Sequence, residues 1–229
     1  MFSPVGRGVG SVLALAVGAA ISPLPVIAVV LMLLSRRART DGPSFLLGWA
    51  LGLGAVSSVV YLVTDGAGAS SGGNAGRGVS WGLIVLGVLL LAMAGRRWRR
   101  RPPPGVAPET PRWMRGIDSM TPLPAFGLAV VLAAAAPKNL VLSAGAGAAL
   151  GQLGLTAPEV AVSLLVYVLV GSSTIGAPVV LYLTGGQRAR AALEGFHGWL
   201  DAHGDAVLTV LLLVFGAVLV AKGLPPLTS

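Results

Sequence analysis

Long apolar runs, separated by short polar or charged segments, make up most of this chain. They predict six membrane-spanning helices, at about residues 9–34, 44–64, 79–95, 123–150, 157–184 and 205–222. These lengths are close to or above the ~20 residues with which a helix crosses a bilayer. A cleaved signal peptide is a weaker interpretation of the first run, because its apolar residues continue far beyond the length of a signal-peptide core. The predicted fold class is therefore an all-α integral membrane protein.

Arginines are concentrated in alternate connections between the predicted spans. Three connections are rich in them, with Arg36, Arg37 and Arg39 in the first, Arg96, Arg97, Arg99, Arg100, Arg101, Arg112 and Arg115 in the second, and Arg188 and Arg190 in the third. The intervening connections contain only Arg77. Because basic loops stay in the cytoplasm, this pattern predicts a multi-pass protein of the cytoplasmic (inner) membrane with both termini outside the cytoplasm.

The composition agrees with a membrane protein. Hydrophobic residues make up 55% of the chain and charged residues 10%, and the mean hydropathy is +0.84, outside the range of soluble domains. The net charge of +8 lies beside the spans, so it favours anionic lipid headgroups over nucleic acid as a partner. Most of the 33 glycines fall inside apolar segments, where small residues let helices approach closely.

The connection at residues 96–122 is basic and then proline-rich. Its sequence PPPGVAP cannot form a helix, because proline removes a hydrogen-bond donor and fixes φ. We expect a solvated cytoplasmic linker between two three-helix halves, residues 1–95 and 123–229.

The segment 187–205 has a different pattern. Apolar residues recur at helical spacing, namely Leu193, Phe196 and Leu200, which predicts a short amphipathic helix in the membrane interface before the last span. Glu194 and His197 have a Glu-x-x-His spacing, but no second such motif accompanies them. We therefore expect neither a metal site nor a cofactor.

The two halves resemble each other at an offset of about 114 residues. Pro23 then falls on Pro137, within AAISPLP and AAAAPKN. One position further, Pro43 falls on Pro158, and Ser57-Ser58 falls on Ser172-Ser173. A unit of three spans is odd in number, so consecutive copies cross the membrane in opposite directions. Such inverted repeats are typical of secondary transporters, and interrupted helices at matching positions indicate the binding site.

A cation lies next to one of these matching prolines. Lys138, in the middle of a predicted span, costs at least ~2.5–3.5 kcal/mol there. The prolines release carbonyl groups that need protein partners or a wet cavity. Two interpretations stay open: a structural lysine that joins the first and fourth spans through these carbonyls, or a binding site for a phosphate, sulfate or carboxylate. The candidate substrate-binding residues are Ser22, Pro23, Pro25, Ser57, Ser58, Pro137, Lys138, Asn139, Ser172 and Ser173.

Two of these features also have a structural interpretation. The serine pairs are typical of helix–helix hydrogen bonding in membranes. Gly48-x-x-x-Gly52 predicts close helix packing, either within one bundle or across a dimer interface.

The segments SPLPVIAVVLMLLSRRAR, GPSFLLGW and APKNLVLSAGAGA carry a family resemblance. Over essentially its whole length the chain resembles the peptidoglycolipid-addressing family of actinobacteria, also called Sap-like or sulfolipid-addressing, within the LysE superfamily of small exporters. The resemblance implies an inverted three-plus-three repeat, a homodimer and the movement of envelope glycolipids. It also implies a functional centre, formed by Ser22, Pro23, Pro25, Pro137, Lys138 and Asn139.

The expected function is a transporter or transport accessory that moves an anionic lipid or envelope glycolipid toward the cell surface, alone or within a larger export machinery. The chain contains no P-loop sequence, so we expect no ATP binding. One alternative is an exporter of small solutes such as amino acids or ions. Another is a membrane-embedded enzyme, although the spans contain neither paired carboxylates nor histidine. A serine hydroxyl within hydrogen-bond reach of Lys138 in an open cavity would favour the enzyme.

Overall fold

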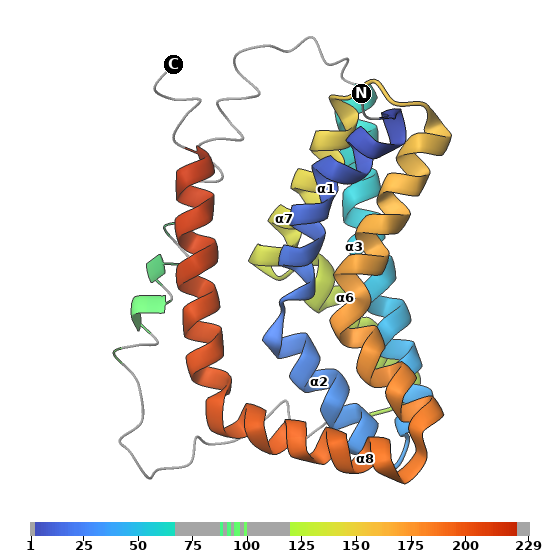
Figure 1. Ribbon diagram of the computed structural model, residues 1–229, viewed down its shortest axis with the longest axis vertical. Coiled ribbons are helices and arrows are strands. Elements are labelled where there is room, and N and C mark those ends of the chain that lie inside the picture. The colour runs from blue at the N-terminus through green and yellow to red at the C-terminus, as the bar shows by residue number, and fades with distance from the viewer. Residues whose placement is uncertain are drawn as a thin grey trace. The chain divides into compact units, whose positions relative to one another are not determined.

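The computed structural model describes residues 3–66 and 120–223, together with 88, 91–92, 94–96 and 99, and beyond Gly186 it describes only part of the side chains. All regular elements in these ranges are α-helices (Figure 1), so the all-α prediction is confirmed for them. The chain forms two compact units, Met1–Ala69 with Arg112–Gly198, and Ser70–Pro111 with Trp199–Ser229. The first unit combines helices from both predicted halves. The linker 96–122 lies almost entirely outside the described residues, so the predicted boundaries stay predictions.

Two of the predicted spans are broken into pairs of helices. The first consists of α1 (Pro4–Ala20) and α2 (Pro23–Leu34), which are bent by 58°. The fourth consists of α6 (Pro122–Ala134) and α7 (Pro137–Gly151), bent by 68° (Figure 1). Both α2 and α7 begin with a proline, which is favourable because the first helical N–H has no intrahelical acceptor in any case. The predicted interruptions at matching prolines are therefore confirmed.

The second and fifth predicted spans are long helices. They are α3 (Ala38–Gly66) and the first part of α8 (Ala157–Gly223). Within α8, Gly186 has a non-helical conformation with φ 56° and ψ −137°, which glycine adopts readily because it has no Cβ. The described residues thus contain two helices long and apolar enough to cross a membrane, or four spans if each bent pair counts as one.

The remaining two predicted spans are less fully described. Most residues of span 79–95 lie outside the described residues. Span 205–222 is helical within α8, but most of its side chains are not described. Six spans and an inverted repeat therefore stay predictions. The segment 187–205 is helical as predicted and begins directly after the kink at Gly186, where α8 consists of two merged helices. The second of these helices extends to Gly223, and the interfacial position of the segment stays a prediction. Of its predicted apolar residues, Leu193 is buried and Phe196 is exposed.

Glycine residues allow α3 to pack closely against both α6 and α7, the two helices of the broken fourth span. A Cβ atom at Gly48 would collide with the carbonyl oxygen of Phe126 in α6, and one at Gly52 would lie 2.7 Å from the Cβ of Ala133. A Cβ atom at Gly147 of α7 would collide with the carbonyl oxygen of Ser57. Of the two interpretations of Gly48-x-x-x-Gly52, the structure therefore supports close packing within the bundle.

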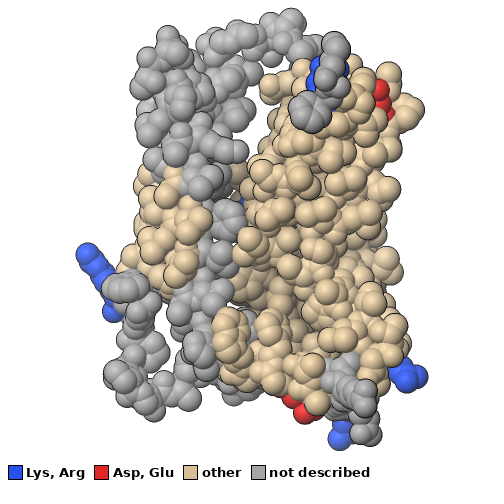
Figure 2. All heavy atoms as spheres, in the orientation of Figure 1, with Lys and Arg blue, Asp and Glu red and all other residues tan. Residues whose placement is uncertain are grey.

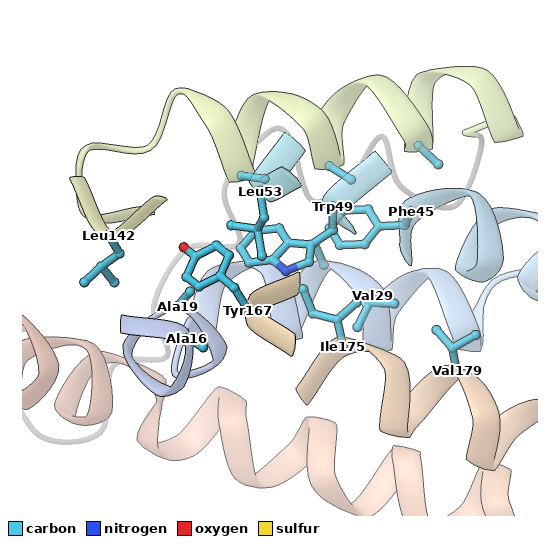
Figure 3. Close-up of a cluster of buried hydrophobic side chains, with 14 of the residues drawn as sticks. Ala16, Ala19, Val29, Phe45, Trp49, Leu53, Leu142, Tyr167, Ile175 and Val179 are labelled. Atoms are coloured by element: carbon cyan, nitrogen blue, oxygen red, sulfur yellow. The ribbon is translucent and has the colours of Figure 1, made fainter. Parts of the chain in front are cut away.

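Aromatic residues of α3 fill the centre of this unit. Phe45 and Trp49 are fully buried, and they lie near Ile175 of α8 (Figure 3). The indole Nε1 of Trp49 donates a hydrogen bond to the carbonyl oxygen of Gly171, 3.2 Å away. This bond fixes α3 to α8 at the level of the central site.

The outer surface of the α3-containing unit is largely apolar. In Figure 2 uncharged side chains cover the broad face between its two ends, and the charged side chains that can be seen lie near those ends. Leu47, Leu51 and Leu62 of α3 are among the large exposed side chains, each more than half accessible. This distribution is typical of a helical bundle surrounded by lipid.

Candidate functional site

The end of α1 leaves four backbone carbonyl groups without helical partners. The last carbonyls of any helix lack intrahelical donors, and here α1 ends at Ala20 inside the bundle. The carbonyls concerned are those of Gly18, Ala19, Ala20 and Ile21. In an apolar surrounding each must find a donor from elsewhere in the protein.

Lys138 supplies donors for two of these carbonyls. Its ammonium nitrogen Nζ lies 2.7 Å from the oxygen of Gly18, 3.1 Å from that of Ile21 and 2.8 Å from Oγ of Ser22. Three N–H groups thus have three oxygen acceptors. A cation is favourable at the carbonyl end of a helix, so Lys138 of α7 acts as a C-terminal cap for α1.

Ser22 and Asn139 extend this arrangement to α6. Ser22 Oγ accepts from Lys138, and its single proton points to the carbonyl oxygen of Ala19 at 2.8 Å or to Oδ1 of Asn139 at 3.2 Å. Asn139 Nδ2 donates to the carbonyl oxygen of Leu132, 3.1 Å away in the last turn of α6. Two consecutive residues at the start of α7 therefore cap the ends of both α1 and α6.

Thr174 of α8 provides a further hydrogen-bond donor at the break between α1 and α2. Its Oγ1 donates to the carbonyl oxygen of Ala20 at 2.6 Å, and the backbone N–H of Ser22 donates to the same oxygen at 2.8 Å. Each carbonyl from Gly18 to Ile21 therefore has a donor group within hydrogen-bond distance. The two breaks are held together by polar contacts from α7 and α8 within an otherwise apolar bundle.

A comparison with known families identifies the chain at this point. The model of the family described as "Sap, sulfolipid-1-addressing protein" matches residues 12–225. The chain belongs to the sulfolipid-1-addressing protein family. The predicted resemblance to a sulfolipid-addressing family is therefore confirmed, and the match includes the central cluster and the helices that form it from residue 12 onward. Neither a curated protein nor a solved structure matches the chain.

In this sulfolipid-addressing family member, the predicted site residues fall into two groups. Ser22, Lys138 and Asn139 contact one another, and Pro23 and Pro137 begin the helices beside them. Pro25, also predicted, is buried in the first turn of α2. In that turn its missing N–H leaves no intrahelical hydrogen bond unmade.

The predicted serine pairs form the second group, and their described hydrogen bonds do not reach Lys138. Ser57 donates to the carbonyl oxygen of Leu53 at 2.8 Å, and Ser173 to that of Val170 at 2.7 Å, each within its own helix. Ser58 is half-buried beside Ser57. Ser172 is 7% exposed, and its Oγ has no hydrogen-bond partner in the part of the chain that the structure describes.

The sequence did not indicate a buried polar contact between α7 and α8. Ser143 Oγ and Tyr167 Oη lie 2.9 Å apart, and both residues are fully buried. No sequence motif distinguishes this pair from a tyrosine and a serine that lie outside the core. The sequence also did not indicate that Asp41, near the start of α3, is fully buried.

The geometry of the site can also be compared with the requirements of a serine–lysine nucleophile and of a metal site. The Ser22–Lys138 distance satisfies the distance condition for a serine–lysine pair, but Ser22 is only 4% exposed. Its oxygen accepts a hydrogen bond from Nζ, whereas the hydroxyl of an activated nucleophile would have to donate its proton to Nζ. Residues 3–66 and 120–223 contain no group of three His, Cys, Asp or Glu side chains placed to hold a metal ion, as far as their side chains are described.

Proposed function

We propose that this family member moves, or helps to move, an anionic lipid or envelope glycolipid toward the cell surface, and that the two helix breaks form its central binding site. The observation that carries this proposal is the position of the Lys138 ammonium group at the helix breaks, where it donates to the oxygens of Gly18, Ile21 and Ser22. Carbonyl and hydroxyl oxygens carry only a partial negative charge. The oxygens of an anionic headgroup would accept from the same N–H groups and add the attraction of opposite charges.

The proposed ligand group is a sulfate or phosphate ester. The family description names a sulfolipid, and a sulfate oxygen accepts from an ammonium group in the same way as a phosphate oxygen. A sulfate or phosphate oxygen carries negative charge, so it attracts an ammonium group more strongly than a neutral carbonyl oxygen at the same distance does. A headgroup that reaches Nζ would therefore displace the carbonyls of Gly18 and Ile21.

This exchange would couple binding to a change in the bundle. The bonds from Lys138 to Gly18 and Ile21 join α7 to the end of α1, so their release frees the two broken spans to move apart. Asn139 would still hold α7 to α6 through Leu132. Movement of one half relative to the other around a fixed central site is the way in which transporters with inverted repeats alternate access.

The remaining parts of the proposal concern assembly and topology. We place the protein in the inner membrane with six spans in an inverted repeat of LysE type and both termini outside the cytoplasm. The alternating arginine-rich connections support this topology. A homodimer, alone or bound to a larger export machinery, is the proposed working form.

Lipid that copurifies with the protein tests the central site. The chain contains two lysines, Lys138 and Lys222, so Lys222→Met is a control with the same change in charge as Lys138→Met. Protein is purified from membranes that contain phosphatidylglycerol and phosphatidylcholine, and the bound lipids are quantified by mass spectrometry. We expect the anionic lipid to be enriched in the wild type and in the control, and the enrichment to be lost in Lys138→Met.

Equal enrichment in all three proteins would contradict a headgroup site at Lys138. Binding of a free amino acid or inorganic ion in place of lipid would instead favour a small-solute exporter. The Ser22–Lys138 contact also allows a direct test of an enzymatic role. Chemical modification of a lipid-linked substrate by the wild type, abolished in Ser22→Ala, would favour an enzyme over a transporter.

A further inference from the structure

A carboxylate is completely buried at the beginning of α3. Asp41 has no exposed surface and lies in the first turn of this helix. Its Oδ1 accepts a hydrogen bond from Oγ1 of Thr40 at 3.2 Å, whereas Oδ2 has no hydrogen-bond partner among the described residues. A buried carboxylate oxygen that is neither paired nor hydrogen-bonded is strongly unfavourable.

Asp41 lies on the packed face of α3. It precedes Phe45 by four residues and Gly48 by seven, so it shares the helix face that packs against α6. A Cβ atom at the adjacent Gly42 would lie within 4 Å of Leu33 in α2 and Val179 in α8. Apolar side chains of both helices therefore approach the start of α3 beside Asp41.

Among the side chains that the structure describes on these elements, no charged or titratable group forms a hydrogen bond with Oδ2 of Asp41. Arg36, Arg37 and Arg39 are exposed, and none forms a hydrogen bond to Oδ2. The sequences of α2 and α6 contain no titratable residue, and the titratable group of α8 nearest to Val179 is the phenol of Tyr182. The positive end of the α3 dipole favours a carboxylate, but it does not supply a donor to Oδ2.

We propose that Asp41 binds an exchangeable monovalent cation, a proton or Na⁺, and, resting on the proposed transport function, that this cation is the coupling ion of the protein. A cation is the ligand that a carboxylate oxygen without a donor can accept. Asp41 is the fully buried acidic residue of the described chain, and its single negative charge is balanced by a monovalent cation, whereas a divalent cation would leave a net positive charge in a buried site. Binding of the cation changes the charge on the face of α3 that packs against α6. It would therefore affect the packing between these two helices, which belong to different predicted halves of the chain.

Infrared spectroscopy of the purified full-length protein distinguishes the two cations without a transported substrate. A protonated carboxyl group has a carbonyl stretching band that a carboxylate lacks. Asp41→Asn removes the proposed site, and Asp65→Asn removes an exposed carboxylate from the other end of the same helix. Thermal unfolding is measured in parallel over a range of Na⁺ concentrations.

If the cation is a proton, the wild type and Asp65→Asn show a protonated-carboxyl band above about pH 6, where exposed carboxyl groups are ionised. This band disappears reversibly as the pH is raised further, and Asp41→Asn lacks it. If it is Na⁺, the band is absent, and Na⁺ raises the melting temperature of the wild type and of Asp65→Asn but not of Asp41→Asn. A band that persists at every pH would show a permanently neutral structural acid and overturn the proposal. Absence of both effects from the wild type would overturn it as well. Neither result depends on lipid binding at Lys138.

Discussion

The close contact between α7 and α3 leads to a quantitative prediction. A Cβ atom at Gly147 would collide with the carbonyl oxygen of Ser57 and lie 2.8 Å from the backbone nitrogen of Tyr61. Both atoms belong to the backbone of α3, so neither can rotate away. Gly145, two residues earlier on the same helix, provides a control, because a Cβ atom there would lie 3.6 Å from a methyl group of Leu15, an ordinary contact distance.

The two Gly→Ala substitutions separate packing from helix propensity. Alanine is favoured over glycine inside a helix by about 1 kcal/mol, and this gain applies to both positions. Overpacking costs about 1–3 kcal/mol and applies to Gly147→Ala alone. We therefore expect Gly147→Ala to be less stable than Gly145→Ala by about 1–3 kcal/mol, which corresponds to about 2–12 °C in melting temperature for a chain of this length.

Thermal unfolding of both variants in the same detergent, followed by tryptophan fluorescence, measures this difference. Equal melting temperatures for Gly147→Ala and Gly145→Ala would refute the close approach of α7 to α3. The contact matters for the site because α7 begins with Pro137 and Lys138. A displacement of α7 would change the distances from Lys138 to the carbonyls of α1.

Two further predictions concern polar contacts between helices. Thr174→Val removes the bond to the Ala20 oxygen without changing side-chain shape, so we expect a loss of ~0.5–1.5 kcal/mol in the free energy of unfolding. Thr184→Val removes a bond within α8 from an exposed residue, so its effect should stay within ~0.5 kcal/mol, and equal losses would refute the tie to α1. Tyr167→Phe and Ser143→Ala each leave one buried hydroxyl without its partner and should cost ~1–3 kcal/mol each. The double variant should cost clearly less than the sum of the two, whereas strict additivity in denaturant unfolding would contradict a direct bond.

The sequence was sufficient to locate the helix breaks. Proline cannot supply an N–H to a continuing helix, so SPLP and APKN had to interrupt the two apolar runs wherever the helices packed. The same reasoning predicted that freed carbonyls and Ser22 would be partners of Lys138. Which carbonyls these are depends on the approach of α7 to α1 across 120 residues of sequence, and local patterns contain no information about that distance.

In the serine pairs, hydrogen bonds within the same helix compete with contacts to the central site. Ser57 and Ser173 were predicted to line the central site, but serine in a helix readily donates to a carbonyl three or four residues earlier, as both do here. Their predicted role in substrate binding stays a prediction. Thr174, the residue after the second serine pair, instead reaches another helix, because its hydroxyl donates to the carbonyl of Ala20.

The burial of Asp41 could not be predicted from the sequence. It follows an arginine-rich segment directly, and a charged residue in that position is usually solvated. The second span was predicted to begin at residue 44, whereas α3 begins at Ala38. This earlier start places Asp41 on the buried face of the helix, four residues before Phe45. A shift of one and a half turns in a helix boundary therefore changed an expected loop residue into a candidate ion site.

The central claim is that an anionic headgroup binds at the ammonium group of Lys138, and magnetic resonance of the side-chain nitrogen tests it most directly. Protein labelled with nitrogen-15 in lysine has two side-chain signals, from Lys138 and Lys222, and Lys222→Arg assigns them. We predict that phosphatidylglycerol shifts the Lys138 signal in a saturable manner and that phosphatidylcholine does not. A Lys138 signal that stays unchanged while the protein still binds phosphatidylglycerol would contradict the claim, because the headgroup would then lie elsewhere.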